Sequence, residues 1–294
     1  MKTPRTTLTE QLVGFAWAAW AELGVSGWKG PRAERCIDPE ALMLLTGSLG
    51  DADARLRDES LDWCATYRDL LSRSRLSHLH KIWPEAKSWQ AYSAASSKVT
   101  GESWPGAGSA RRRELSGRSR LLLQDRPALV GLRIRAAFGA TARSEVVRAL
   151  LLDDPGKGVG AAEIAEEAGC TKRNAASALT GLGRAGLVTA SRTPRGDLFR
   201  VAKGEALAEL FGPLPSVRTS FLATCRAAWI LARGLDALEK ASDAVRSVEA
   251  RRVLTVAAPD LHRLAETPSS PTPGRDAWSD VRGWAVEWID RLVI

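Results

Sequence analysis

The stretch from Ala161 to Val201 constrains the fold more than any other segment of the chain. Apolar residues recur at helical spacing in residues 162–168 and again from Thr171 onward, which predicts two consecutive helices. Two short runs follow, 187–192 and 197–201, and they predict a pair of strands joined by a tight tip. A chain with this order of elements buries one face of each helix beside a small antiparallel hairpin.

Another helix precedes this stretch, and a glycine separates the two helices within it. The preceding helix is predicted over Ala142–Leu152, where Val and Leu residues recur on one side. Gly169 stands between the next two helices, where the backbone must turn through a left-handed conformation. Thr171 is the expected N-cap of the last helix, and Gly186 marks its end. Three helices and a hairpin in this order predict a winged helix-turn-helix, a module that places a helix in the DNA major groove.

The distribution of charge along the chain supports the same interpretation independently. Residues 111–202 contain 17 Lys and Arg against 9 Asp and Glu, whereas residues 1–110 contain 13 of each sign and residues 203–294 contain 12 of each. The whole formal charge of +8 therefore lies on the segment with the predicted module. A basic excess confined to one module is typical of nucleic-acid binding.

The segment AAEIAEEAGCTKRN…ALTGLGRAGLV resembles the winged helix of MarR- and ArsR-type bacterial transcriptional regulators. Their "AELA…LG…S" helix and turn, their recognition helix and the "AGLV" that enters the wing match these residues, over about a third of the chain. Just before it, LRIRAAFGATARSEVVRALL bears a weaker resemblance to winged-helix regulators encoded beside nucleotidyltransferase genes, including toxin–antitoxin and phage-defence loci. Antitoxins of that kind carry the winged helix at the N-terminus, whereas here it is central. The resemblance implies DNA binding through the recognition helix and the wing.

The residue types in the predicted recognition helix and wing suit DNA contacts. Arg173 can bridge guanine O6 and N7, and Asn174 can bridge adenine N6 and N7. Arginines on the hairpin suit phosphates or the minor groove. The alternative is a winged helix that binds protein, because a fold alone does not give function. The expected DNA-binding residues are Thr171, Lys172, Arg173, Asn174, Ser177, Arg184, Arg192, Thr193, Arg195 and Arg200.

Outside this module the chain predicts helices and two linkers, over 93–118 and over 267–274, so the expected fold class is mostly α. The basic run Arg111–Arg113 is interpreted as part of a solvated tether, in preference to an arm lying along phosphates. The last helix, predicted over 276–292, carries a Trp-containing apolar stripe that docks either within the chain or across a dimer. The predicted segments are a helical N-terminal domain over 1–92, a basic Gly/Ser-rich linker over 93–118, the winged helix-turn-helix over 119–203 and a helical C-terminal region over 204–294.

Composition argues against membrane and secreted proteins. No apolar run is long enough to span a bilayer. The four cysteines lie far apart without a CxxC pair, which favours reduced thiols over disulfides or zinc. Thr7-x-x-Glu10 reads as a helix capping box in place of a secretory signal, so we expect a cytoplasmic protein.

The sequence offers no pattern typical of catalysis or metal binding. His78 and His80 are two residues apart on a predicted helix and do not share a face. Gly47-Ser48 followed by Asp51-Ala52-Asp53 imitates two sequence elements of nucleotidyltransferases. In that family intervening chain separates the two elements, whereas here they are almost adjacent, so a helix end and a polar turn explain them better. We therefore expect no catalytic residue, no metal and no cofactor, and hence not an enzyme.

The leading hypothesis is a sequence-specific double-stranded DNA-binding transcriptional regulator. We expect a repressor that acts as a homodimer, because a dimer presents two recognition helices to half-sites about one helical turn apart. The alternative hypothesis is an antitoxin-like or phage-defence adaptor whose helical N- or C-terminal region binds a protein partner. Neighbouring genes discriminate between the two, since an adjacent nucleotidyltransferase or nuclease favours the adaptor.

Overall fold

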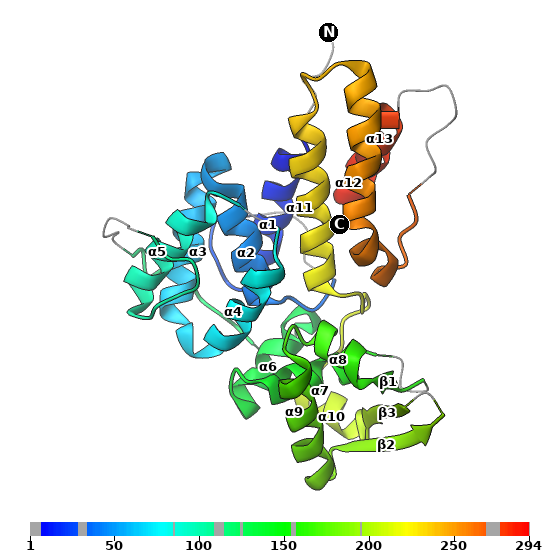
Figure 1. Cartoon of the computed structure of the whole chain (residues 1–294). Coiled ribbons are helices and arrows are strands. Elements are labelled where there is room, and N and C mark those ends of the chain that lie inside the picture. Colours follow the sequence, from blue (N-terminus) through cyan, green and yellow to red (C-terminus); the bar gives the residue numbers. More distant parts are fainter. Residues whose placement is uncertain are drawn as a thin grey trace.

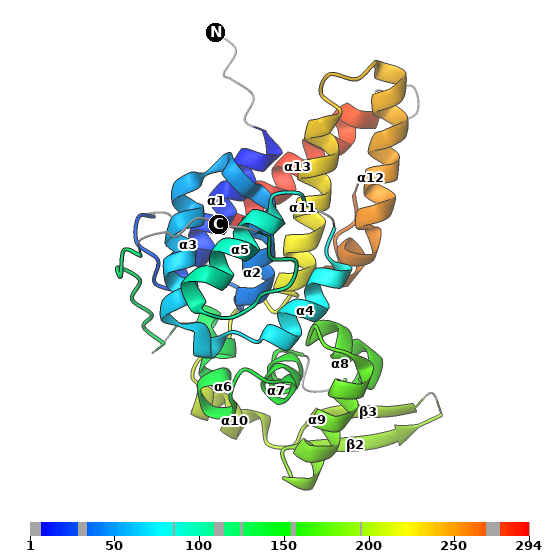
Figure 2. The same cartoon turned by 60° about the vertical axis from the view of Figure 1, so that its left-hand side comes forward.

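The chain is mostly helical, as expected, and its helices form a body that stands on a smaller central unit (Figures 1 and 2). Within the described residues, no helix is both long and apolar enough to cross a bilayer. The computed structural model describes residues 7–28, 34–84, 86–108, 115–123, 126–153, 157–194, 196–268 and 277–293.

The helical body combines the two ends of the chain. The first five helices and the last three lie side by side in it, and short 3₁₀ turns occur at Gly50–Ala52 and Arg68–Leu70. Its helices are α1 (Leu8–Glu22), α2 (Pro39–Leu49), α3 (Ala54–Thr66), α4 (Arg73–Ile82), α5 (Trp89–Thr100), α11 (Phe221–Ala237), α12 (Asp243–Arg263) and α13 (Ala277–Val293).

The central unit spans residues 127–211 and contains the sheet. It begins with a 3₁₀ turn at Pro127–Leu129, and its sheet has the order β1-β3-β2 with antiparallel pairing throughout. The register pairs Val188 with Val201 in the hairpin and Val159 with Phe199 on the other edge. Its elements are α6 (Val130–Phe138), α7 (Ala142–Leu152), β1 (Val159–Gly160), α8 (Ala161–Glu167), α9 (Lys172–Arg184), β2 (Val188–Thr193), β3 (Gly196–Val201) and α10 (Gly204–Phe211).

Capping residues fix where several of these helices begin. Thr7 and Glu10 form the predicted capping box at α1, because the Thr7 hydroxyl accepts from the Glu10 amide and the Glu10 carboxylate accepts from the Thr7 amide. Asp38 caps α2 ahead of a proline at the first helical position. Helix α7 has the predicted bounds, and Thr171 caps α9.

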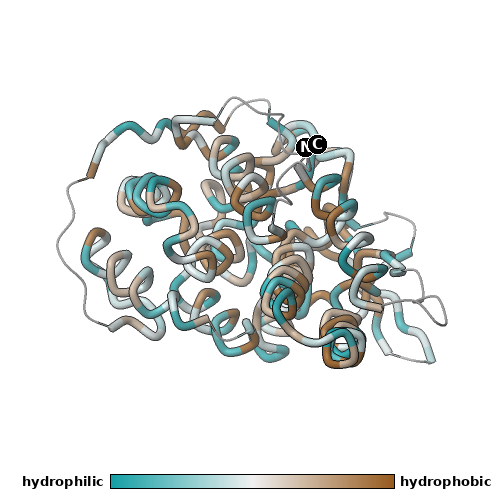
Figure 3. Tube along the Cα trace, turned by 90° about the horizontal axis from the view of Figure 1, so that it is seen from above, coloured by the Kyte–Doolittle hydropathy of each residue, from teal (hydrophilic) through white to brown (hydrophobic). Residues whose placement is uncertain are grey.

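One apolar core fills the helical body, and both ends of the chain contribute to it. The largest fully buried side chains include Trp20 and Trp63 from the first half and Trp288 from the last helix. In the view from above, the helices surround a shared interior and each carries apolar residues, drawn brown (Figure 3). The stripe of α13 is buried within the chain, since Trp278 and Trp288 are almost inaccessible. Of the two docking modes left open by the sequence, the structure shows the intramolecular one.

The segment predicted as a linker contains ordered structure. Residues 93–100 complete α5, and Trp104 beyond them is buried with its indole N–H donating to Thr100 Oγ1 at 2.8 Å. The prediction failed here because the buried residues of α5 within 93–100 are small or hydroxyl-bearing. These pack closely but leave no apolar period in the sequence. The run 111–113 lies outside the described residues.

The central unit meets the body through a cluster of charged side chains that are almost completely buried. At most 5% of each side chain is exposed to solvent. Three come from the body and three from α6 and α7, and the charges balance. The members of this junction cluster are Asp38, Glu40, Arg75, Arg135, Glu145 and Arg148.

Short ion pairs connect the junction cluster across the boundary. Glu40 Oε2 lies 2.7 Å from Arg75 Nη1 and 2.6 Å from Arg135 Nη2. Arg135 continues to Glu145, with 2.7 Å between Nε and Oε1. Burial alone would raise the pKa of Glu145, but Arg135, Arg75 and Arg148 together lower that pKa to about 2. The Glu145 carboxylate is therefore ionised at neutral pH, and the ion pairs of Arg135 with Glu40 and of Arg75 with Glu145 hold the two parts together.

Further contacts from the helical body hold α8 in place. Arg75 Nε donates to the carbonyl of Ala168, directly after α8, at 2.7 Å. Arg263 from α12 lies 3.0 Å from Glu166 and 2.9 Å from Glu167. The turn between α8 and α9 is thus held in a fixed position relative to the body.

Candidate nucleic-acid interface

Helix α9 has one buried side and one polar, solvent-exposed side. Ala175, Leu179 and Leu182 belong to the core of the central unit. The side chains of Lys172, Arg173, Asn174 and Ser177, together with the capping Thr171, are exposed. Thr171 Oγ1 accepts from the Asn174 amide at 3.2 Å, so its hydroxyl fixes the first turn. The structure therefore brings the five predicted residues at the start of this helix together on one outward surface.

The turn before α9 requires a glycine for two reasons. Gly169 has φ +60°, and the Cys170 amide donates back to the carbonyl of Ala165 at 3.0 Å. A Cβ atom at Gly169 would lie 2.8 Å from Leu79 and 2.9 Å from Arg75 on α4. The glycine thus allows both the left-handed turn and the close approach of α4 to the start of α9.

The β2–β3 hairpin contributes fewer of the predicted contacts. Arg192 is exposed, opposite Asp197 in the register. Thr193 is half-buried, and its hydroxyl donates to the Gly196 carbonyl at 2.6 Å, so it closes the tip. Arg195 lies outside the described residues.

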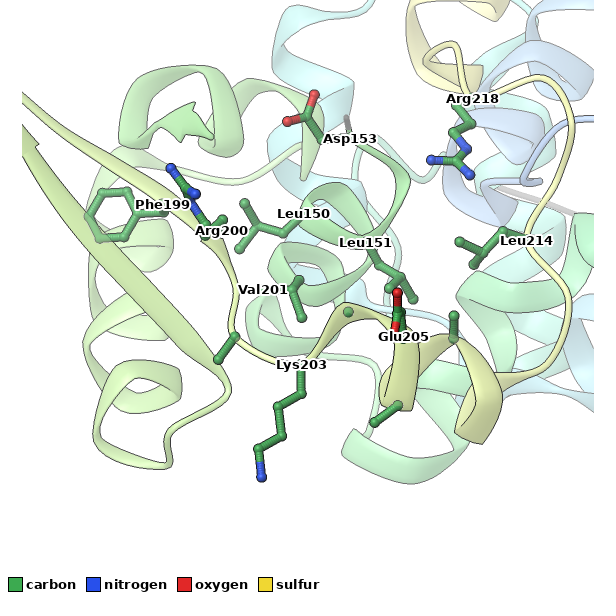
Figure 4. A pocket seen from close by; sticks show the side chains of 14 residues that line it. Leu150, Leu151, Asp153, Phe199, Arg200, Val201, Lys203, Glu205, Leu214 and Arg218 are labelled. Carbon is green, nitrogen blue, oxygen red and sulfur yellow. The ribbon is translucent and has the colours of Figure 1, made fainter. Parts of the chain in front are cut away.

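Arg200 is placed differently from the other predicted cations. It is half-buried, and its side chain lines a cavity at the base of the hairpin (Figure 4). Arg184, by contrast, is exposed at the last turn of α9. The predicted contacts therefore separate into an outward group on α9 and β2 and an inward arginine on β3.

The outward cations have no ion-pair partner in the described part of the chain, although Asp197 stands opposite Arg192 in the hairpin register. Lys172, Arg173, Arg184 and Arg192 form no ion pair with any described residue. These four side chains, here called the outer cations, differ in this from most arginines of the body. An exposed, unneutralised positive surface attracts a polyanion such as nucleic acid.

Sequence reasoning missed a residue from a neighbouring helix. Arg143, in the first turn of α7, is exposed and lies against Gly181 of α9, where a Cβ would be 3.6 Å from its Nε. A shallow depression joins Arg143 to Asn174 and Ser177. Its position two residues after the Thr141 cap places it at a helix start, but nothing in the linear sequence indicates that this start adjoins α9.

Helix α4 was also given no role by the sequence. It packs against the turn before α9 through Arg75 and Leu79, and it contains no acidic residue. Its exposed side chains include Arg73 and Lys81. The positive character of the surface around α9 is therefore not interrupted by carboxylates of this helix.

Asp53 and the four cysteines lie in structural settings. No group of three or more His, Cys, Asp or Glu side chains among them could hold a metal ion. Asp53 caps α3 and accepts from the Trp17 indole at 2.7 Å, so it serves the helix start. Burial raises the pKa of the Cys36 thiol to about 11 and that of Cys64 to about 12, which keeps both thiols protonated.

Comparison of the chain with protein-family models, with curated proteins and with solved structures gives no significant match. The function of this protein is therefore inferred from its own geometry. The strongest feature in that geometry is the polar, cationic outer side of α9.

Proposed function

We propose that the protein is a sequence-specific double-stranded DNA-binding transcriptional regulator. The proposal treats α7, α8, α9 and the β2–β3 hairpin as a winged helix-turn-helix, with α9 as the recognition helix. The observation that carries it is the contrast between the two sides of α9. One side is fixed in the core, while the other presents exposed Lys172, Arg173, Asn174 and Ser177 without neutralising carboxylates.

Different residues on this surface have different tasks in the proposal. Arg173 and Asn174 read base edges in the major groove, where both side chains can make bidentate contacts. Arg143 and Arg192 bind the phosphates on either side, which adds affinity without sequence preference. Lys172 supports the same backbone contacts from the start of α9.

The regulator acts as a cytoplasmic homodimer and a repressor in this proposal. Two copies place two α9 helices in successive major grooves, about one helical turn apart. Binding across a promoter then excludes the transcription machinery. Size-exclusion chromatography with light scattering, with and without a selected duplex, measures whether one or two chains bind each site.

A second candidate function has one observation in its favour. Helix α12 exposes three valines along its length, with 49% of Val245, 62% of Val248 and 56% of Val256 accessible to solvent. Val245 and Val248 are three residues apart and so lie next to each other on the helix surface, with Val256 about two turns further along, and exposed apolar residues of this kind favour contact with a protein. An adaptor whose helical body binds a protein partner is therefore the alternative.

Selection of a binding site followed by fluorescence anisotropy tests the proposal. Purified full-length protein is used to enrich a random duplex library, and the enriched duplex and its scrambled form are titrated across a salt series. We expect at least about a thousandfold preference for the enriched duplex and a steep loss of affinity with salt.

Two variants distinguish the loss of a DNA contact on α9 from a general effect of removing an exposed arginine. Arg173→Ala is the test, and Arg252→Ala on α12 is the matched control because that arginine is also exposed but lies in the helical body. Equal binding of both duplexes by the wild type, or equal affinities of the two variants, contradicts the proposal and favours the adaptor.

A further inference from the structure

A cavity of about 610 Å³ opens at the base of the hairpin, inside the central unit. Its walls come from the end of α7, from β3, from the start of α10 and from the segment that leads to α11 (Figure 4). Leu150, Leu151, Val201 and Leu214 form its apolar lining. This volume lies within the range of small-molecule sites in proteins, which are mostly apolar with a few polar groups.

Two opposite charges line the same cavity without neutralising each other. Arg200 and Asp153 are both half-buried, and neither forms an ion pair with any residue in the described part of the chain. The Nε atom of Arg200 is inaccessible to solvent and has no hydrogen-bond partner among those residues. A buried donor without an acceptor is costly, so this guanidinium is set to receive an anionic group.

The remaining charged residues of the cavity form its rim. Arg218 and Glu205 are exposed, one of each sign, and Figure 4 shows both beside the apolar lining. The Lys203 side chain extends away from the other lining residues in the same view. The half-buried lining residues therefore carry one cation and one anion, and Arg218 and Glu205 add an exposed pair at the rim.

We propose that this cavity binds a small zwitterion with an apolar body, of which a hydrophobic α-amino acid is the simplest example. The ligand carboxylate pairs with Arg200, its ammonium pairs with Asp153, and its side chain covers Leu150 and Val201. A simple organic anion would leave Asp153 without a partner and a simple cation would leave Arg200 without one. A ligand that carries both charges satisfies both half-buried groups at once.

The ligand site adjoins the hairpin directly. Arg200 lies on β3, opposite Thr189 of β2 in the register, so a ligand held by Arg200 contacts the strand that supports the hairpin. Control of DNA binding by this ligand rests on the proposed function. Binding of the ligand itself does not, and it is measured without DNA.

Calorimetric titration of the full-length chain with L-leucine, L-phenylalanine and L-tryptophan tests the site. We expect at least one of them to bind with a Kd below about 1 mM. The matched amide, which lacks the carboxylate, and the matched acid, which lacks the ammonium, should each bind about tenfold more weakly or worse. Absence of binding by all three amino acids, or equal binding of an amino acid and its amide or its deaminated acid, overturns the proposal.

Substitutions then assign each charge to its residue. Arg200→Gln should remove the preference for the amino acid over its amide, and Asp153→Asn should remove the preference over the deaminated acid. Arg252→Gln, at an exposed position on α12, should change neither. If Arg200→Gln does not fold, Arg200→Lys keeps the charge and should retain the preference over the amide. Loss of affinity for all ligands alike in the Arg200 or Asp153 variant contradicts the assignment.

Discussion

The junction cluster and the outer side of α9 both depend on arginine, but they place it in opposite surroundings. Arg75, Arg135 and Arg148 are buried and each lies against at least one carboxylate. Arg173 and Arg192 are exposed and form no ion pair with described residues. A buried arginine that loses its carboxylate lowers the stability of the fold, because its charge is then unpaired and shielded from water. An exposed arginine without a carboxylate remains available to an external anion. The first region therefore fixes the structure, and the second is suited to binding.

Removal of one carboxylate from the junction cluster should have the largest effect. Glu40→Gln takes the negative charge from between Arg75 and Arg135, so we expect the free energy of unfolding to fall by about 3–5 kcal/mol. Urea denaturation measures this loss. The matched control is Asp243→Asn, which breaks an exposed ion pair with Arg246 and should cost less than about 1 kcal/mol. Equal losses would show that the cluster is no more important for stability than a surface pair.

Acid should weaken the same cluster. The neighbouring arginines hold the pKa of Glu145 at about 2 in the folded protein, below its ordinary value of 4.5, so its contribution is complete above pH 4.5. That contribution should be lost as the pH falls from about 4.5 toward 2, because protonation then favours the unfolded chain. The difference in unfolding free energy between the wild type and Glu145→Gln should therefore narrow over this interval. A difference that stays constant with pH would contradict the lowered pKa.

The sequence predicted the local elements of both regions but not the buried junction. Helix α9 could be predicted because its signals are local: Gly169 and the capping Thr171 come just before it, and its apolar residues recur at helical spacing. The same spacing predicts which side of the helix faces outward. The junction cluster joins residues from 38 to 148, and nothing in the linear pattern pairs Glu40 with Arg135. Strand β1 was missed for a related reason, since two residues show no period of their own.

The buried arginines of the junction cluster change how the net charge of the chain is interpreted. The basic excess of residues 111–202 includes Arg135 and Arg148, which are buried, and their counter-charges include Glu40 from outside that window. A count of charged residues along the chain therefore treats buried and exposed arginines alike, although only the exposed ones can contribute to a binding surface. The outer cations remain the informative part, because they are exposed and unpaired within the described structure.

On the outer side of α9, loss of a base-reading side chain should have an intermediate effect. Arg173→Ala should weaken binding to the selected duplex by about 1–3 kcal/mol and relax the preference at one base position. Because Arg173 is exposed and unpaired, the melting temperature should not change. Anisotropy titrations against the selected duplex and its single-base variants provide the test. Unchanged affinity and preference would show that α9 does not read DNA bases.

The smallest effect is expected where only a phosphate contact is lost. Arg192→Ala should weaken binding to the selected and scrambled duplexes alike, because a phosphate contact carries no sequence information. The slope of log affinity against log salt should become shallower by about 0.9, which corresponds to one counterion per phosphate contact. Titrations of both duplexes at several salt concentrations measure this change. A loss confined to the selected duplex would instead place Arg192 against a base edge, and the hairpin would then share with α9 the reading of sequence.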